Sequence, residues 1–149
     1  MYFSAKEILA QLDGTDMRIC DLVIKNETEI SEISREEIFS MLEERYQIMY
    51  NSAHDALEKE IRSLSGLTGG SAKKMWEYYK KGSSICDNTI IRGAAYALSC
   101  LEVNASMGLI VASPTAGACG ILPGSLQKNM TSHISRFWKL LQPLPVSVS

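Results

Sequence analysis

The spacing of apolar residues in this chain is that of α-helices, and no segment shows the alternation that is typical of strands. The longest regular pattern follows a capping box formed by Ser34 and Glu37, and it predicts a helix from about Arg35 to Leu64. Apolar residues recur in it at steps of three and four and form one stripe: Ile38, Met41, Leu42, Met49, Ala53, Ala56 and Leu57. This stripe predicts the longest helix of an all-α fold.

Two shorter helices are predicted before the long one. Ser4 and Glu7 form a capping box that starts a helix ending near Asp13. A second helix is predicted from Met17 to Thr28. Its inner face is expected to consist of three apolar side chains: Ile19, Leu22 and Val23.

Two more helices are predicted after the long one, beyond a loop at 65–70 that contains three glycines. The first runs from Ser71 to Lys81, and the second from Asn88 to Leu109 with Asp87 as its N-cap. Small residues line the second of these helices, so neighbouring helices can approach it closely: Ala94, Ala95, Ala97, Ser99, Ala105, Ser106 and Gly108. The predicted architecture is a helical domain in which glycine-rich loops join the helices.

Composition and charge narrow the class of protein. Of the 149 residues 46% are apolar and 21% are charged, which is typical of a soluble globular domain. The net charge of −2 disfavours a nucleic-acid partner or an anionic membrane surface. The least polar stretch, Gly93–Ala112, is interrupted by Glu102 and Asn104, so it predicts a buried helix and no membrane span. The start of the chain lacks the pattern of a signal peptide, so we expect a cytoplasmic protein.

Four cysteines are present, and none lies at the short spacing of a metal-binding motif. Disulfides are not expected in the reducing cytoplasm. Cys20, Cys86 and Cys100 are interpreted as thiols of the core. Neither of the two histidines, His54 and His133, is assigned a catalytic role.

The run Ser113–Gly124 carries the strongest candidate chemistry. It places Cys119 among small residues directly after a long helical pattern, and its two prolines disfavour a continuous helix. Gly117 and Gly120 allow the backbone to approach a ligand closely. Two interpretations of the cysteine are open on chemistry alone: a buried, inert thiol in a turn between helices, or a ligand of a metal or cluster.

With this loop in view, the chain resembles the alpha chain of iron–sulfur-dependent L-serine dehydratase. Three stretches carry the resemblance: the 65–70 loop, Glu102–Met107 and, above all, Ser113–Gly124. The sequence Pro-Thr-Ala-Gly-Ala-Cys-Gly is the most specific of these markers. The likeness extends over residues 1–124, which are predicted to be the N-terminal part of the catalytic domain.

The resemblance implies a [4Fe–4S] cluster held by three cysteine thiolates, of which Cys119 corresponds to the first. The iron that lacks a protein thiolate accepts the hydroxyl of serine, a base removes the Cα proton, and water leaves. The resulting aminoacrylate hydrolyses to pyruvate and ammonia, without pyridoxal phosphate. The implied partners are L-serine and a serine dehydratase beta chain, and an oligomer is possible. Glu102 and Asn104, just before the loop, are interpreted as groups that support the site.

A substrate site is also suggested by the two loops. The hydroxyls of Ser113 and Thr115 could orient the carboxylate of the substrate, and so could the amides of Thr68, Gly69 and Gly70 if the loops converge. The alternative for each residue singly is structural, with hydroxyls that cap helix ends and glycines that form turns.

The C-terminal part of the sequence departs from the family pattern. The other two cluster cysteines of the family lie further along the chain, whereas no cysteine follows Cys119 here. One thiolate cannot hold a cluster, so the chain alone is expected to be incomplete and inactive. Residues 125–149 lose the helical stripes and are predicted to be an atypical, poorly ordered tail. A frameshift is one hypothesis for it, because the codons of Gln127–Thr131 shifted by two bases encode [Lys/Glu]-[Lys/Glu]-[Tyr/His]-Asp.

Two other functions compete with a serine-deaminating lyase. One is a noncatalytic helical interaction module that pairs with a beta chain or a separate C-terminal piece. The other is a cluster-dependent hydro-lyase for another small hydroxy acid. An incomplete chain is also expected to fold poorly and to aggregate or oligomerise, because helices that lack the half on which they pack would expose an apolar patch.

Overall fold

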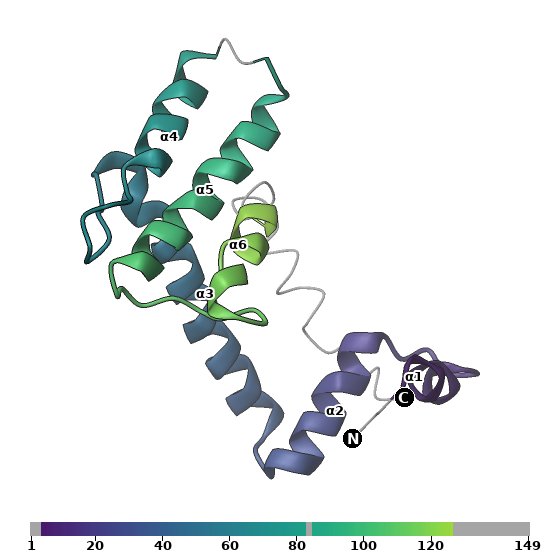
Figure 1. The fold of residues 1–149 in the computed structure, drawn as a ribbon. Coiled ribbons are helices and arrows are strands. Elements are labelled where there is room, and N and C mark those ends of the chain that lie inside the picture. Colours follow the sequence, from purple (N-terminus) through teal and green to yellow (C-terminus); the bar gives the residue numbers. More distant parts are fainter. Residues whose placement is uncertain (1–3, 83–84, 127–149) are drawn as a thin grey trace. The chain divides into compact units, whose positions relative to one another are not determined.

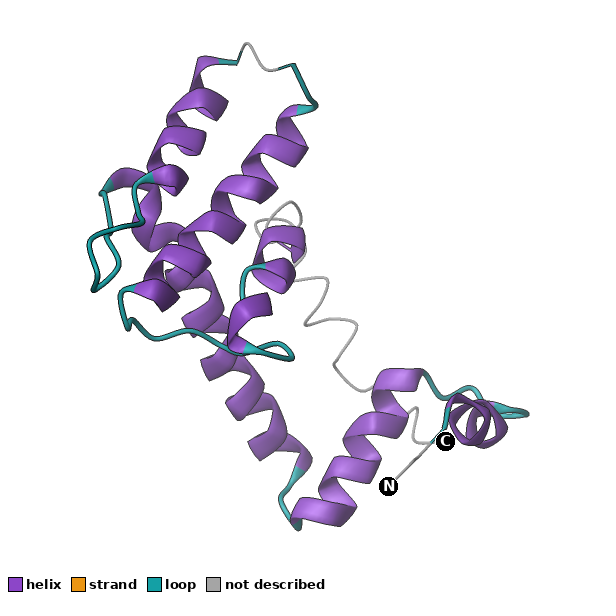
Figure 2. Ribbon diagram, viewed as in Figure 1, coloured by secondary structure: helices purple, strands orange, loops and turns teal. Residues whose placement is uncertain are grey.

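The computed structural model describes residues 4–82 and 85–126 of the chain, and within these residues it is helical without a strand (Figures 1 and 2). The predicted all-α fold is thus confirmed. The elements are, in chain order, α1 (Ala5–Leu12), α2 (Ile19–Ser31), α3 (Arg35–Glu58), α4 (Ser71–Lys81), α5 (Asn88–Ala105), the 3-10 helix η1 (Ala116–Ala118) and α6 (Ile121–Leu126). The predicted tail at 125–149 lies outside the described residues from position 127 onward.

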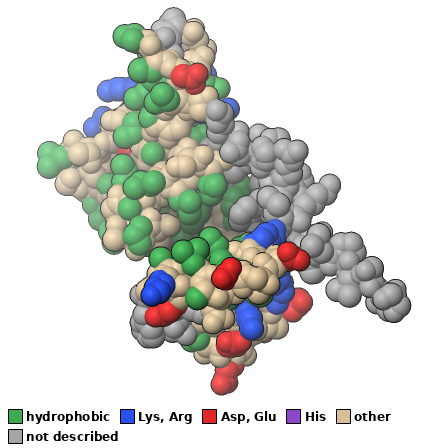
Figure 3. All heavy atoms as spheres, turned by 90° about the vertical axis from the view of Figure 1, so that its right-hand side faces the viewer, with side chains coloured by type: hydrophobic (Ala, Val, Ile, Leu, Met, Phe, Trp, Pro, Cys, Tyr) green, Lys and Arg blue, Asp and Glu red, His purple; other side chains and the backbone are tan. Residues whose placement is uncertain are grey.

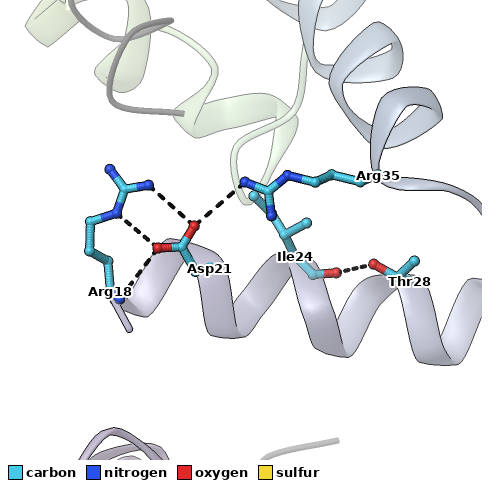
Figure 4. A network of polar contacts seen from close by, with 5 residues as sticks. All are labelled: Arg18, Asp21, Ile24, Thr28 and Arg35. Carbon is cyan, nitrogen blue, oxygen red and sulfur yellow. Dashed lines mark hydrogen bonds and ion pairs between the residues drawn. The ribbon is translucent and has the colours of Figure 1, made fainter. Parts of the chain in front are cut away.

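The chain divides into two compact units, residues 1–44 and residues 45–149. In the first unit, α2 begins after Arg18, whose Nε lies 2.8 Å from Oδ2 of Asp21. Arg35, at the start of α3, approaches Oδ1 of the same carboxylate to 3.5 Å (Figure 4). The hydrogen bond from Arg18 is the main cause that lowers the pKa of Asp21. Asp21 therefore joins the start of α2 to the start of α3.

The start and inner face of α2 differ from the prediction. Leu22 and Ile24 are buried, whereas Ile19 and Val23 are 59% and 53% exposed. Arg18 takes an extended conformation as the N-cap, which delays the start of the helix. The neighbouring α1 is only 8 residues long and buries none of its own residues, so it cannot cover the full stripe of α2.

The stripe of α3 is buried at both ends of the helix and exposed between them. Ile38, Ala53, Ala56 and Leu57 are buried, and Met49 is half-buried. Met41 and Leu42 belong to the same stripe but are 42% and 41% exposed, and they lie close to the point where the chain divides into its two units.

The core of the second unit lies between the C-terminal half of α3, α4, α5 and the loop that precedes α6. Its buried members form one cluster: Ala53, Leu57, Ala95, Tyr96, Cys100 and Cys119. Met75, Trp76 and Ile110 pack against this cluster. Ser99 fastens α5 to α3, because its hydroxyl donates to the carbonyl of Ser52 (2.7 Å) and accepts from the amide of Ala56 (3.0 Å).

The helix α3 ends at Glu58, six residues before the predicted end. The chain then folds back, and Arg62 and Gly69 form an isolated antiparallel bridge. A Cβ atom at Gly69 would lie 2.7 Å from the Cα of Arg62, so this approach requires glycine. The amide of Leu64 donates to the carbonyl of Ala105 at the end of α5 (3.3 Å). These contacts between distant residues end the helix earlier than the local sequence predicts.

Two further differences concern α5 and α6. The helix α5 ends at Ala105 instead of Leu109, because Met107 has a positive φ of 64° and Gly108 donates to the carbonyl of Val103 (2.8 Å). Pro123 was expected to interrupt helical structure, but it lies buried within α6. It occupies the first turn, where a helix has no acceptor for an amide hydrogen, so proline is tolerated.

Candidate functional site

Cys119 lies between η1 and α6 with its side chain turned into the core of the second unit. It is 2% exposed, and its Sγ lies 3.9 Å from the carbonyl oxygen of Cys100, to which it donates. Burial raises the pKa of the Cys119 thiol. Burial therefore favours the neutral form of this thiol, which packs within the core cluster.

The loop that carries Cys119 is attached to the last turn of α5. The side-chain amide of Asn104 donates to the carbonyl of Ala116 (3.3 Å) and so fixes the start of η1. Thr115 is the N-cap of η1, and its hydroxyl oxygen accepts a hydrogen bond from the amide of Ala118 (3.2 Å). The structure thus gives Thr115 the capping role that was its structural alternative. Ser113 is half-buried just before it.

Glu102 attaches the other glycine-rich loop to the same turn of α5. Its Oε1 accepts from the amides of Ser71 (2.6 Å) and Ala72 (3.1 Å), which are the first two residues of α4. Glu102 is only 8% exposed, and its Oε2 is buried without a hydrogen-bond partner. The carboxylate therefore caps α4 from a different helix, at the end where the helix dipole favours negative charge.

Residues 68–70 are engaged mainly in the structure of their own loop. The amide of Thr68 donates to Oγ of Ser63 (3.2 Å), and its carbonyl accepts from the amide of Ser63 (2.9 Å). Gly69 forms the bridge with Arg62, and Gly70 is the buried N-cap of α4 with a φ of 77°. Both glycines adopt a positive φ, which other residues rarely adopt.

The two loops do not converge in the way that a shared substrate site would require. Glu102 and Asn104 are two positions apart, which is about 200° around a helix, so their side chains leave α5 on opposite sides. One holds the start of α4 and the other holds η1. Figure 1 shows the 59–70 loop and the 106–118 loop on either side of the C-terminal end of α5. The structure therefore brings Ser113, Thr115 and Cys119 together on one loop and places Thr68–Gly70 apart from them.

The other cysteines and the histidine of the described region contribute no second ligand. Cys100 is 1% exposed, as predicted for a core thiol, and its Sγ lies 3.5 Å from Oγ of Ser52. Cys20 is half-buried. The prediction is wrong for Cys86, which is exposed because it lies in the connection between α4 and α5. Nδ1 of His54 lies 2.7 Å from the carbonyl oxygen of Tyr50, and His133 lies outside the described residues.

In the part of the chain that the structure describes, no three His, Cys, Asp or Glu side chains come together where they could hold a metal ion. Likewise, none of its helices is both long and apolar enough to cross a membrane.

Sequence reasoning assigned supporting roles to Glu102 and Asn104 but not the contacts that they make. The pattern Glu102–Val103–Asn104 places two polar residues directly after a stretch of apolar and small residues at 93–101. Such residues are unusual inside a core unless they are hydrogen-bonded. The sequence thus indicates that both side chains need hydrogen-bond partners. Which groups these partners are depends on the fold.

The comparisons with known proteins point to one family. The family model described as "Serine dehydratase alpha chain" matches residues 14–147, beyond Gly124. The chain is 35% identical to the probable L-serine dehydratase alpha chain of Bacillus subtilis over 126 residues, which are 85% of this chain and 42% of that protein. It is 37% identical to the L-serine dehydratase alpha chain of Peptoniphilus asaccharolyticus (85% and 43%). It is 30% identical to L-serine dehydratase TdcG of Escherichia coli (84% and 28%).

The chain thus spans about two fifths or less of the length of these curated relatives. No solved structure matches it.

Proposed function

The chain belongs to the family of serine dehydratase alpha chains, and we propose that it forms the N-terminal part of an enzyme that deaminates L-serine to pyruvate and ammonia. In this proposal it works with a beta chain in the cytoplasm. The observation that carries the proposal is the loop around Cys119, which is the most specific family marker and is attached by Asn104 to the end of α5.

The described residues do not by themselves fit a [4Fe–4S] cluster. Cluster iron is held by several thiolates, whereas Cys119 is a single, buried thiol with a raised pKa. The neighbouring Cys100 thiol is less acidic still, since burial raises its pKa to about 11. We therefore propose that Cys119 contributes one of the three family ligands and that the remaining ligands come from a segment outside this sequence. The 149-residue chain alone is then inactive.

The role that we propose for this chain's own residues is the binding of the substrate carboxylate. The hydroxyl of Thr115 accepts from Ala118 but keeps its own hydrogen, so it can still donate to a carboxylate. Ser113 lies on the same loop and offers a second hydroxyl. Residues Thr68, Gly69 and Gly70 are proposed to act only indirectly, through the start of α4, because Glu102 holds that loop on the other side of α5.

The test is reconstitution of the chain under anaerobic conditions with iron, sulfide, a serine dehydratase beta chain and the part of the Bacillus subtilis alpha chain that this sequence does not match. We expect cluster absorbance in the visible region and the formation of pyruvate from L-serine. Cys119→Ala should abolish both. Cys86→Ala is the matched control, because it removes an exposed cysteine outside the loop and should change neither.

Other outcomes separate the competing functions. Iron binding without pyruvate formation, but with dehydration of a different small hydroxy acid, would favour a hydro-lyase with another substrate. Assembly of the chains without iron in any combination would favour a noncatalytic interaction module. Full activity of Cys119→Ala would contradict the assigned role of the loop.

A further inference from the structure

A groove of about 330 Å³ runs along the second unit between α5 and α6. Its floor consists of small residues: Gly93, Ala97, Gly120 and Gly124. These residues bring the two helices so close that a Cβ atom at Gly120 would lie 2.6 Å from the carbonyl oxygen of Ala97. The floor of the groove is therefore backbone and methyl groups, which an incoming helix can approach closely.

The rim of this groove is apolar and exposed. Ile90 on α5 is 64% exposed and Ile121 on α6 is 68% exposed, and both line the groove. Figure 3 shows hydrophobic side chains gathered on the face of the second unit that is turned toward the viewer. Contiguous exposed apolar surface is typical of sites at which a protein binds another segment.

One charge lies in the groove. Arg92 is the only charged residue among those that line it, and in the described part of the chain it forms no ion pair. A half-buried guanidinium beside apolar walls favours a partner with a carboxylate at that position.

We propose that this groove is the docking site for a helix from the part of a serine dehydratase alpha chain that this sequence does not contain. The helix would place an apolar stripe on Ile90 and Ile121 and an acidic side chain at Arg92, which is the helix-in-groove mode of recognition. The choice of partner rests on the proposed function.

Two observations point to this occupant. First, the curated alpha chains are more than twice as long as the region that they share with this chain, so a large segment is available to pack on it. Second, the lining of the groove includes Gly120, the residue directly after Cys119. A segment that completes the site at Cys119 must come close to this loop, and the groove offers an apolar path to it.

The test is co-expression of the tagged 149-residue chain with the part of the Bacillus subtilis alpha chain outside the 126 matched residues, followed by capture on the tag. We expect the wild-type chain to retain this segment. Ile121→Asp should lower the retained amount at least tenfold, and Ile90→Asp and Arg92→Glu should lower it severalfold. Leu67→Asp is the matched control, since Leu67 is 86% exposed and lies outside the groove.

Helix content and the melting temperature of each variant chain alone test whether unfolding causes a loss of retention. We expect both to stay at the wild-type value, because all four substituted residues line the groove or lie on the surface. Failure of the wild-type chain to retain the segment, or equal retention by the groove variants, would overturn the proposal. So would a homodimer of the chain alone that Ile121→Asp dissociates, since the groove would then take a second copy. Groove variants that lower the melting temperature without changing retention would also overturn it, because residues 127–149 would then be the occupant.

The two proposals fail in different ways. A captured complex that forms no pyruvate with a beta chain and iron would contradict the proposed function and leave the docking site intact. Serine deamination that survives the groove substitutions would contradict the docking site alone.

Discussion

At the scale of single residues, Glu102 shows how one side chain can determine where another helix begins. Gly70, the N-cap of α4, has no side chain that could bind the free amides of the first turn. Glu102 supplies the missing acceptor from 31 positions away, with one carboxylate oxygen bound to two amides. The other oxygen is buried without a partner, which makes the arrangement sensitive to substitution.

We expect Glu102→Ala to lower the free energy of unfolding by about 2–3 kcal/mol, because two amides at a buried helix start lose an acceptor that carries charge. Glu102→Gln keeps an acceptor oxygen in place and should cost about half as much. Urea denaturation followed by circular dichroism measures both. Equal stability of Glu102→Ala and the wild type would show that solvent satisfies these amides and that Glu102 is not a cap.

The thiols of Cys100 and Cys119 are the other informative residues. Both lie in the core cluster, and burial is the largest cause of the raised pKa of each thiol. Burial favours the neutral form of a thiol. At a pH above the pKa of the unfolded thiol, deprotonation stabilises the unfolded state, so the fold loses stability.

The pH dependence of stability follows from this shift. For Cys100 the pKa is about 11 in the fold, against a reference value of 9.0. The contribution of this thiol to stability is therefore complete below pH 9 and is lost as the pH rises toward 11, by about 2–3 kcal/mol. Denaturation of the wild type and Cys100→Ala at a series of pH values isolates the effect, because other groups titrate equally in both. Parallel stability curves above pH 9 would contradict it.

At the scale of elements, the packing of α5 against α6 depends on the absence of side chains. A Cβ atom at Gly124 would lie 2.9 Å from the carbonyl oxygen of Gly93, and one at Gly120 would lie 3.0 Å from the Cα of Ala97. Backbone atoms cannot turn aside as a flexible side chain can, so any larger residue must move one of the helices.

We expect Gly120→Ala to destabilise the second unit by about 1–3 kcal/mol through this overlap. Gly117→Ala is the control from the same loop, because its Cβ would meet only Oγ1 of Thr115, at 3.9 Å. That change should alter the free energy of unfolding by less than about 1 kcal/mol. Urea midpoints of the two variants test the comparison. Equal destabilisation by both would mean that the whole loop, and not the contact with α5, is intolerant of substitution.

The starts of α3, α4 and α5 agree with the prediction, whereas the end of α3 does not. The capping box of Ser34 and Glu37 is confirmed in both directions, with hydrogen bonds of 3.2 and 2.8 Å, because it depends only on residues three positions apart. The end of α3 depends on contacts made after the helix, namely the bridge of Arg62 with Gly69 and the hydrogen bond from the amide of Leu64 to the carbonyl of Ala105 at the end of α5. No local pattern contains such contacts.

The candidate site also combines features that the local sequence predicts with features that depend on the fold. The residues of the loop around Cys119 could be recognised from their order, since family markers are local sequence. The direction of the Cys119 side chain and the separation of the two loops depend on which side of α5 Glu102 and Asn104 occupy. Cys86 was predicted to be a core thiol but is exposed, because its position in the connection between two helices could not be read from the residues around it.

At the scale of the whole molecule, the two units differ in how many hydrophobic side chains they bury. The core cluster lies entirely in residues 45–149 and draws on α3, α5 and the loop of Cys119. The first unit buries Leu22, Ile24 and Ile38, and its α1 has no buried residue. Helices as short as α1 are marginal in water unless packing supports them.

We therefore expect hydrogen exchange to separate the units. Amides of α1 should exchange close to the rate of an unfolded peptide, whereas amides near Ser99 and Cys100 should exchange about 1000-fold or more slowly, since their opening requires global unfolding. Mass spectrometry of peptides from α1, α2 and α5 gives the three rates, with α2 between the others because Asp21 and two buried side chains hold it. Protection of α1 equal to that of α5 would mean that α1 packs on a surface absent from this arrangement, such as a partner chain, and that the first unit is more stable than its own contacts allow.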